Sequence, residues 1–414
     1  MAELDVLSRG DATGGEWLNA LRAFSDKYGG ASSFDWDRQV KHVAVANVWS
    51  QLQKQTTTSG EDPLLSLTVV KILMRGRDSI DVFLSVEAFE LFIRVAEQAT
   101  DEAAACEAIK CAINSVYKRP SFVADLLATQ TTYDTLFHLT SLARPFAWHT
   151  LVWKCLLATF EHPAAIERVE HTLHGYACIL PTLAFCVQCP HSLPHDGDRV
   201  ALATELLKVL YVFASAWQNA MCLPPAIESI ADPAMALLSN VLALPNSQSL
   251  LELKLHAANV LLLVQHPALV DRFICYDGVG HTIALLEYVI MKVRVEHTQD
   301  PGVVVPVVIG LHQLAKNSVK GLSLLQQAIF QINNHTSAEI AQTTPLSELP
   351  MSPPPLVKGC LQQTLCTFMT STNTDLKRCV SEFLFTLCRH NALEFTQRTG
   401  LGNAVALLRL KGIM

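Results

Sequence analysis

The sequence predicts an all-α protein, an armadillo/HEAT-like right-handed superhelix of stacked helical repeats, and three observations support this prediction. Half of the 414 residues are apolar, only 7% are aromatic, and Leu, Ala and Val dominate. Gly and Pro fall between periodic segments rather than within them, which favours helices. Equivalent helices recur about every 40 to 47 residues, the spacing of armadillo and HEAT units. A chain of this length exceeds one compact globule, so two domains or an elongated array are expected.

Amphipathic segments follow one another from the start of the chain. The first four lie at 16–28, 39–53, 63–75 and 85–97. Helix starts are predicted at Asp62-Pro63, at Thr100-Asp101-Glu102 and at Asp232-Pro233, because each pairs an oxygen acceptor or a proline with a first helical turn. Strongly apolar helices at 202–215, 253–264 and 282–293 lie between more polar ones. Each apolar helix must therefore be covered on several sides, as in stacked repeats.

Two polar, proline-rich stretches interrupt this pattern. They lie at 189–199 and 343–355, the second reading TTPLSELPMSPPP. Such composition is typical of exposed loops within an array rather than of linkers between domains. We therefore expect residues 1–414 to form a single armadillo-like repeat domain.

Charge and hydropathy narrow the class of protein. A net charge of −7 and a pI near 6.1 argue against a general nucleic-acid binder, which needs a basic face. No apolar stretch is long enough to cross a bilayer, and the acidic start MAELDVLSRGD is not a secretory signal. The 12 cysteines lie mostly on apolar helical faces, as core residues of a reducing compartment do. A cytoplasmic protein is expected.

Enzyme motifs are missing from the sequence. It contains no G-x-x-x-x-G-K-[ST] loop, and Gly278-Val279-Gly280 lacks the preceding strand and the third glycine of a phosphate-binding turn. Neither H-E-x-x-H nor G-x-S-x-G occurs. We expect no direct nucleotide binding, no cofactor and no catalysis by side chains.

One group of residues has the composition of a zinc site. Cys186, Cys189, His191 and His195 could supply four nitrogen and sulfur ligands. However, Cys189 and His191 are only two positions apart and Pro190 stiffens that step, so the chain would have to fold straight back. The alternative, which we prefer, is that Cys186 ends an apolar helix and the histidines are solvated loop residues.

A basic stretch offers a better binding signal. Helical periodicity places Lys71 and Arg75 one turn apart on one face. With Lys110 and Asn114 on the equivalent helix of the next repeat, they could form a ladder of basic and amide groups along a concave groove. Such a ladder suits a peptide that ends in a carboxylate. The alternative is a solvated helix face, which periodicity alone favours.

One armadillo-type unit at the C-terminal end carries a family resemblance. Its marks are the helix start Asp375-Leu376-Lys377-Arg378, the stripe Glu382-Phe383-Leu384-Phe385, and the later pieces Thr399-Gly400, Gly402-Asn403-Ala404, Leu407-Leu408 and Lys411-Gly412-Ile413-Met414. On these pieces the chain resembles the synembryn family of chaperones and guanine-nucleotide exchange factors for heterotrimeric G-protein α subunits. Weaker likeness extends back to the helix of Lys71.

The resemblance implies a site and a partner. In synembryns the groove-facing helices of the early repeats take up the C-terminal helix of Gα, and Lys71, Arg75, Arg77, Lys110 and Asn114 match that region. Asn259 fits a further groove residue, or alternatively a capped amide of the core. The implied protein is a cytoplasmic monomer, extending to the cell cortex, that reaches membranes only through its partner.

The chain also departs from the family pattern. Tyr211-Val212 stands where relatives tend to have an aromatic residue followed by asparagine, so one amide contact is missing. The acidic, phosphorylatable tail of the family is absent from the 414 residues, so we expect either a truncated chain or a lost tail. An armadillo-type peptide-binding scaffold or adaptor without exchange activity is the alternative function.

Overall fold

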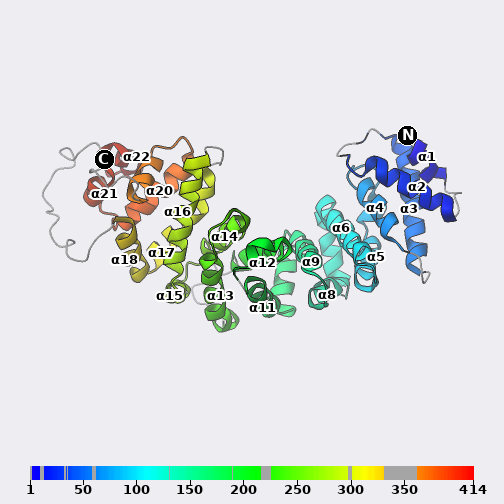
Figure 1. Cartoon of the computed structure of the whole chain (residues 1–414), viewed down its shortest axis with the longest axis horizontal. Coiled ribbons are helices and arrows are strands. Elements are labelled where there is room, and N and C mark those ends of the chain that lie inside the picture. The colour runs from blue at the N-terminus through cyan, green and yellow to red at the C-terminus, as the bar shows by residue number, and fades with distance from the viewer. Residues whose placement is uncertain are drawn as a thin grey trace. The chain divides into compact units, whose positions relative to one another are not determined.

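The computed structural model is helical throughout the part of the chain that it describes, with no strand in that part (Figure 1). It describes residues 2–9, 14–31, 34, 36–57, 62–129, 131–188, 190–215, 225–296, 301–330 and 361–414. The helices group into two compact units, Met1–Cys178 and Ile179–Met414, and the boundary falls inside α11. The prediction of an all-α array of stacked helical repeats is confirmed.

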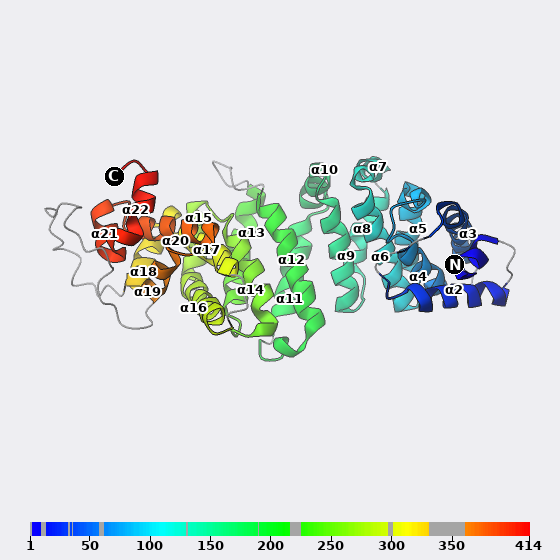
Figure 2. The same ribbon diagram turned by 90° about the horizontal axis from the view of Figure 1, so that it is seen from above.

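The first unit is built in two layers of helices. In one layer α2, α4, α6 and α9 pack side by side in that order (Figure 2). In the other layer α5 covers α6 and α8 covers α9, while α1 packs on α3 and α3 on α4. The bounds are α1 (Ala2–Arg9), α2 (Gly14–Tyr28), α3 (Arg38–Thr57), α4 (Leu64–Leu73), α5 (Val86–Gln98), α6 (Glu102–Lys118), α7 (Val123–Thr129), α8 (Thr131–His138), α9 (Phe146–Thr159) and α10 (Pro163–Glu167).

Helix α6 shows why the layers pack closely. Ala104, Ala108 and Ala112 recur every four residues and are fully buried, so one small-residue stripe faces the neighbouring helices. Cys111 Sγ donates to the carbonyl oxygen of Leu67 on α4 at 3.4 Å. These short side chains keep the backbone of α6 near α4, which matters for the charged groups that the two helices share.

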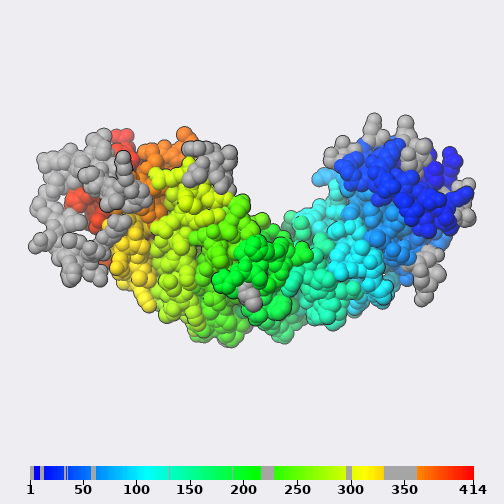
Figure 3. Space-filling view, in the orientation of Figure 1, coloured from blue at the N-terminus to red at the C-terminus, as the bar shows by residue number. Residues whose placement is uncertain are grey.

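The second unit repeats this arrangement. Helices α12, α14, α17 and α20 pack in succession, and α13 packs on α14, α15 and α16. The bounds are α11 (Gly175–Val187), α12 (Gly197–Ser215), α13 (Pro225–Ala243), α14 (Gln248–Leu261), α15 (Pro267–Cys275), α16 (Gly278–Glu296), α17 (Val305–Asn317), α18 (Val319–Phe330), α19 (Leu361–Phe368), α20 (Thr374–Leu387), α21 (Ala392–Thr399) and α22 (Leu401–Leu410). Side chains fill the space between successive helices within each unit (Figure 3).

The predicted helix starts hold in two places and fail in one. Asp101 caps α6, accepting from Ala104 N at 2.9 Å, and Asp62 accepts from Leu64 N at 2.9 Å where α4 begins. The start predicted at Asp232-Pro233 is wrong, because α13 runs from Pro225 through Pro233 to Ala243. A proline inside a helix removes one backbone donor, and the packing of α13 on three other helices outweighs that local loss.

The predicted loops are only partly described. Within 189–199, a single turn at Leu193–His195 precedes α12, which already begins at Gly197. The loop predicted at 343–355 lies outside the described residues. Because the contacts divide the chain into two units, the single domain over 1–414 stays a prediction.

Within the described ranges, no single helix combines the length and apolar composition needed to cross a membrane. The pair α15 and α16 meets that standard only when both helices are counted together across a bend of 80°.

Candidate functional site

Two of the predicted site residues meet on either side of a carboxylate. Lys71 on α4 and Lys110 on α6 both pair with Glu107, which lies one turn before Lys110. Lys110 Nζ donates to Glu107 Oε1 at 2.7 Å, and Lys71 Nζ forms an ion pair with Glu107 Oε2. The side chains of Lys71 and Lys110 are 25% and 41% exposed, whereas that of Glu107 is 12% exposed. We call these three residues the α4/α6 cluster.

The two lysines keep Glu107 ionised. Burial by itself would raise the pKa of this carboxyl, but the hydrogen bonds and charges of Lys110 and Lys71 outweigh burial and lower the pKa below its ordinary value. One carboxylate therefore compensates two ammonium groups, and the cluster has one positive charge in excess. The side chain of Lys110 is the more exposed of the two lysines.

The α4/α6 cluster borders an open hollow of about 480 Å³. Helix α2 contributes Arg22 and Ser25 to its lining, which otherwise comes from the start of α4, from Thr68 and Lys71 on α4, and from Ala103, Cys106, Glu107 and Lys110 on α6. A hollow of this size has room for the end of a peptide rather than for a folded domain.

Arg75 is committed to the protein itself. It follows the end of α4, and its guanidinium donates to three carbonyl oxygens at the end of α2, those of Tyr28 at 3.1 Å, Gly29 at 2.8 Å and Ala31 at 2.5 Å. These carbonyls are left without helical partners where α2 ends. A substitution of Arg75 would therefore loosen this corner, so Arg75 is a poor probe of partner binding.

The remaining predicted residues are dispersed. Arg77 is exposed on the loop between α4 and the short turn at Asp81–Leu84, and Asn114 is half-buried on α6, one turn after Lys110. Asn259 is half-buried on α14 and belongs to the second unit. The structure thus brings Lys71 and Lys110 together and places Asn114 one turn along α6 from Lys110. Asn259 lies in the second unit, and its position relative to those three residues is not defined.

Asn259 has a charged neighbourhood of its own. One turn before it on α14 lies His256, and on the adjacent α12 Lys208 Nζ donates to Glu205 Oε1 at 2.8 Å. Burial lowers the pKa of His256, and the charge of Lys208 lowers it further against the opposing effect of Glu252 and Glu205. We call Glu205, Lys208 and His256 the α12/α14 cluster.

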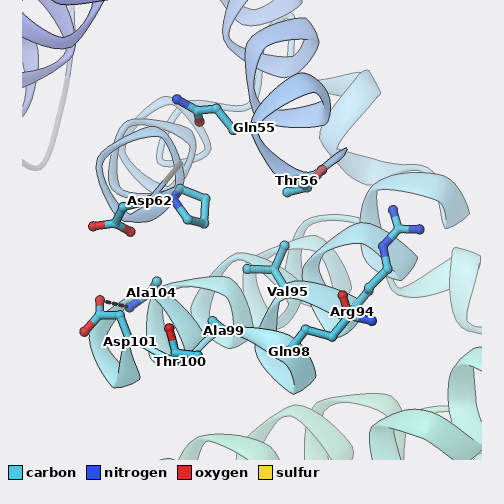
Figure 4. Close-up of a pocket in the computed structure, with 11 residues that line it drawn as sticks. Gln55, Thr56, Asp62, Arg94, Val95, Gln98, Ala99, Thr100, Asp101 and Ala104 are labelled. Carbon is cyan, nitrogen blue, oxygen red and sulfur yellow. Dashed lines mark hydrogen bonds between the residues drawn. The ribbon is translucent and has the colours of Figure 1, made fainter. Parts of the chain in front are cut away.

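A second hollow of the first unit, of about 330 Å³, contains none of the predicted site residues (Figure 4). Its two carboxylates, Asp62 and Asp101, each accept a backbone N–H at the start of a helix. Arg94 and Asp101 lie at opposite ends of it (Figure 4). Because the carboxylates serve as helix caps, this hollow offers no converging set of groups for a ligand.

The structure gives no support to a zinc site at Cys186, Cys189, His191 and His195. Cys186 is buried near the end of α11, and burial raises the pKa of its thiol to about 11, which disfavours the thiolate that zinc requires. His191 and His195 are exposed, and Cys189 lies outside the described residues. Among the residues that the structure does describe, no three His, Cys, Asp or Glu side chains form a group that could hold a metal ion.

Glu107 is the member of the α4/α6 cluster that the sequence interpretation did not name. Its spacing to Lys110 is the (i, i+3) spacing of helical ion pairs, so that half of the cluster had a visible signal. The pair between Glu107 and Lys71 joins two helices that are separated by α5, and no spacing rule predicts it.

Comparison with known proteins places the chain in a family. Residues 66–414 match the family model described as guanine nucleotide exchange factor synembryn, which is most of the chain. The chain belongs to the synembryn family. The resemblance predicted from segment 374–414 is thereby confirmed, and the matched residues include both clusters.

Individual relatives match over shorter stretches. Chaperone Ric-8A of Xenopus laevis is 43% identical over 60 residues, which are 14% of this chain and 11% of the relative. The same figures apply to Chaperone Ric-8A of Gallus gallus and of Mus musculus. An engineered protein of known crystal structure is similar with a TM-score of 0.61 at 13% identity, covering 99% of this chain and 95% of its own; this likeness shows the fold alone.

Proposed function

We propose that this protein acts as a guanine-nucleotide exchange factor and folding chaperone for heterotrimeric G-protein α subunits. The match of residues 66–414 to a family described by its exchange activity carries the proposal. The relatives that match over 60 residues are named as chaperones, which supports the second activity. Exchange and chaperoning both require that a nucleotide-free α subunit be bound and held.

The α4/α6 cluster is the part of the proposed groove that receives the C-terminal helix of Gα. Its excess positive charge and the exposed ammonium of Lys110 suit a terminal carboxylate. Glu107 holds both ammonium groups in position before the partner arrives, so little side-chain entropy is lost on binding. The amide of Asn114, one turn along α6, is the proposed partner for the peptide backbone, and Arg77 and Asn259 are proposed as further contacts.

The proposed mechanism is capture of a conformation. We propose that the protein binds Gα in a conformation in which the C-terminal helix of Gα is detached from the rest of the α subunit. Binding of the protein and binding of GDP to Gα are then linked, so each ligand lowers the affinity of Gα for the other. No side chain of the protein then takes part in bond breaking. The proposal further includes a monomeric, cytoplasmic protein that reaches a membrane or the cell cortex only through Gα.

The experiment that tests this function is GDP release from purified Gα. We expect release to accelerate when the protein is added, and the acceleration to disappear with a Gα that lacks its C-terminal helix. Equal acceleration of GDP release from intact and truncated Gα would contradict binding of the Gα C-terminal helix in the proposed groove. Unchanged GDP release from intact Gα would contradict the exchange activity. A peptide-binding scaffold would instead bind Gα equally well in its GDP-bound, GTP-bound and nucleotide-free forms.

A further inference from the structure

A basic hollow of about 290 Å³ lies in the first unit between the start of α3 and the loop that follows α4. Its walls are Phe34 and Trp36, Arg38 and Lys41 of α3, and Arg75, Gly76 and Asp78 of the loop. We call it the Lys41 pocket. Phe34, Trp36, Arg38 and Lys41 precede residue 66, where the match to the synembryn family begins.

Lys41 is the unusual member of this pocket. It is only 4% exposed, yet its ammonium group donates no hydrogen bond and makes no ion pair with any described residue. Its Nζ lies 5.7 Å from the centre of the Trp36 ring, and a Cβ on Gly76 would come within 2.9 Å of it. Burial lowers the pKa of Lys41. The negative charge of Asp78 opposes this decrease, and the positive charge of Lys118 adds to it.

Lys254 in the second unit is a buried lysine whose ammonium group is paired within the protein, and it serves as a comparison for Lys41. It is 2% exposed, and its ammonium donates to the carbonyl oxygen of Leu244 at 2.7 Å and to Asn246 Oδ1 at 2.5 Å. A charged group that is removed from water without such partners is unfavourable, and a counter-charge that binds beside it relieves that cost. The side chain of Lys41 is nearly as buried as that of Lys254, but its ammonium group lines the pocket and has no such oxygen partner among the described residues.

The charges around the Lys41 pocket indicate the kind of counter-charge. Among the described residues that line the pocket, Arg38, Lys41 and Arg75 stand against one carboxylate, that of Asp78. Lys118 Nζ lies close by, donating to the carbonyl oxygen of Arg75 at 3.1 Å. The described lining residues thus have more than one positive charge in excess, which suits a dianion better than a carboxylate. Asp37, which precedes α3, is occupied in capping that helix, because its Oδ1 accepts from Gln39 N and Val40 N, both at 2.9 Å.

We propose that the Lys41 pocket binds the dianionic phosphate of a phosphate monoester. Lys41 contacts the phosphate from the floor, while the exposed guanidinium of Arg38 closes over it from the rim. Trp36 and Phe34, whose rings are stacked at 4.0 Å, give the carbon atoms next to the ester oxygen an apolar wall. The volume is at the lower end of that of small-molecule sites, which fits a phosphate and its first few linking atoms.

Titration of inorganic phosphate, followed by ³¹P NMR at constant ionic strength, tests the site on the full chain. We expect saturable binding that is about tenfold weaker in Lys41→Met, the loss expected of one charge-assisted hydrogen bond, and unchanged in Lys320→Met, which removes an exposed lysine of α18. Equal binding by wild type and Lys41→Met, or no saturable binding by wild type, would overturn the proposal.

Two further variants test the same site if Lys41→Met does not fold. Arg38→Ala changes an exposed residue, and Gly76→Ala places a methyl group against the ammonium of Lys41. We expect both to weaken phosphate binding, with Gly76→Ala giving the larger loss because the methyl group occupies the floor of the pocket. Unchanged binding in both would refute the site.

The source of the phosphate is tested with two probes and one control ligand. N-acetyl-O-phosphoserine amide represents a phosphorylated peptide, and ribose 5-phosphate represents a small metabolite; binding of either supports the site and the tighter one names the source. N-acetylglutamate amide, a monoanion, should bind about tenfold more weakly than the better phosphate ester. A carboxylate that binds as tightly as both esters would overturn the assignment to a dianion.

Discussion

The α4/α6 and α12/α14 clusters begin from the same motif and differ in what the neighbouring helix adds. Each has a carboxylate and a lysine three residues apart, with ammonium-to-oxygen distances of 2.7 Å in Glu107–Lys110 and 2.8 Å in Glu205–Lys208. The two carboxylate side chains are 12% and 11% exposed. Helix α4 then contributes the charged Lys71 to the first cluster, whereas α14 contributes His256 to the second.

This difference determines what each cluster can attract. The α4/α6 cluster pairs two ammonium groups with one carboxylate, so its excess positive charge attracts an anionic partner. In the α12/α14 cluster the lysine and the carboxylate compensate each other, and the lowered pKa of His256 keeps that ring neutral near pH 7. A motif within one helix therefore fixes an ion pair, while the adjacent helix decides whether the cluster also carries an excess positive charge.

The largest expected effect comes from removal of the shared carboxylate. Glu107→Gln leaves two ammonium groups facing each other in a half-buried place, and we expect it to lower the free energy of unfolding by about 3 kcal/mol. Glu205→Gln removes the partner of a single lysine and should cost about 1 kcal/mol. Urea unfolding of both variants measures the difference; equal losses would show that Lys71 adds nothing to the first cluster.

A smaller effect is expected when the first cluster is converted into the likeness of the second. Lys71→Met leaves Glu107 with one lysine, so we expect the free energy of unfolding to change by less than about 1 kcal/mol. The affinity for a Gα C-terminal peptide should fall about tenfold, since the excess positive charge is gone. Calorimetric titration of the peptide measures this, with Lys208→Met as the matched change in the other cluster; a loss for Lys208→Met as large as that for Lys71→Met would contradict the assignment.

The two clusters should also respond to different ranges of pH. The lowered pKa of Glu107 contributes stability that is present above its ordinary pKa of 4.5 and is lost as the pH falls through its lower folded value. His256 has a folded pKa below 6.5, so the unfolded chain takes up that proton first and stability falls as the pH drops below 6.5.

His256→Gln should therefore flatten the stability profile just below pH 6.5, and Glu107→Gln should flatten it below pH 4.5. These are the smallest of the expected effects, and urea midpoints taken between pH 7 and pH 3.5 measure them. A slope between pH 7 and pH 5 that is the same in wild type and His256→Gln would show that His256 keeps its ordinary pKa in the folded chain.

Local sequence rules predicted the fold well, because helix capping and apolar periodicity act over a few residues. Asp101 starts α6 as its side chain predicts, and the failure at Pro233 shows that packing can retain a helix across a proline. The site was only half predictable for the same reason. Glu107–Lys110 is local, but the pair with Lys71 and the contacts of Arg75 with the end of α2 depend on how separate helices meet.

The measurement that most directly tests the central claim is the affinity of a peptide with the C-terminal sequence of Gα, prepared with a free carboxylate and with an amide at its end. Wild type should prefer the carboxylate peptide by about tenfold, the value of one exposed but preorganised charge contact. Lys110→Glu should abolish this preference, while Lys320→Glu, a charge reversal at an exposed position of α18, should leave it intact. Equal affinity of wild type for both peptides, or an undiminished preference in Lys110→Glu, would contradict the assignment of the α4/α6 cluster as the Gα site.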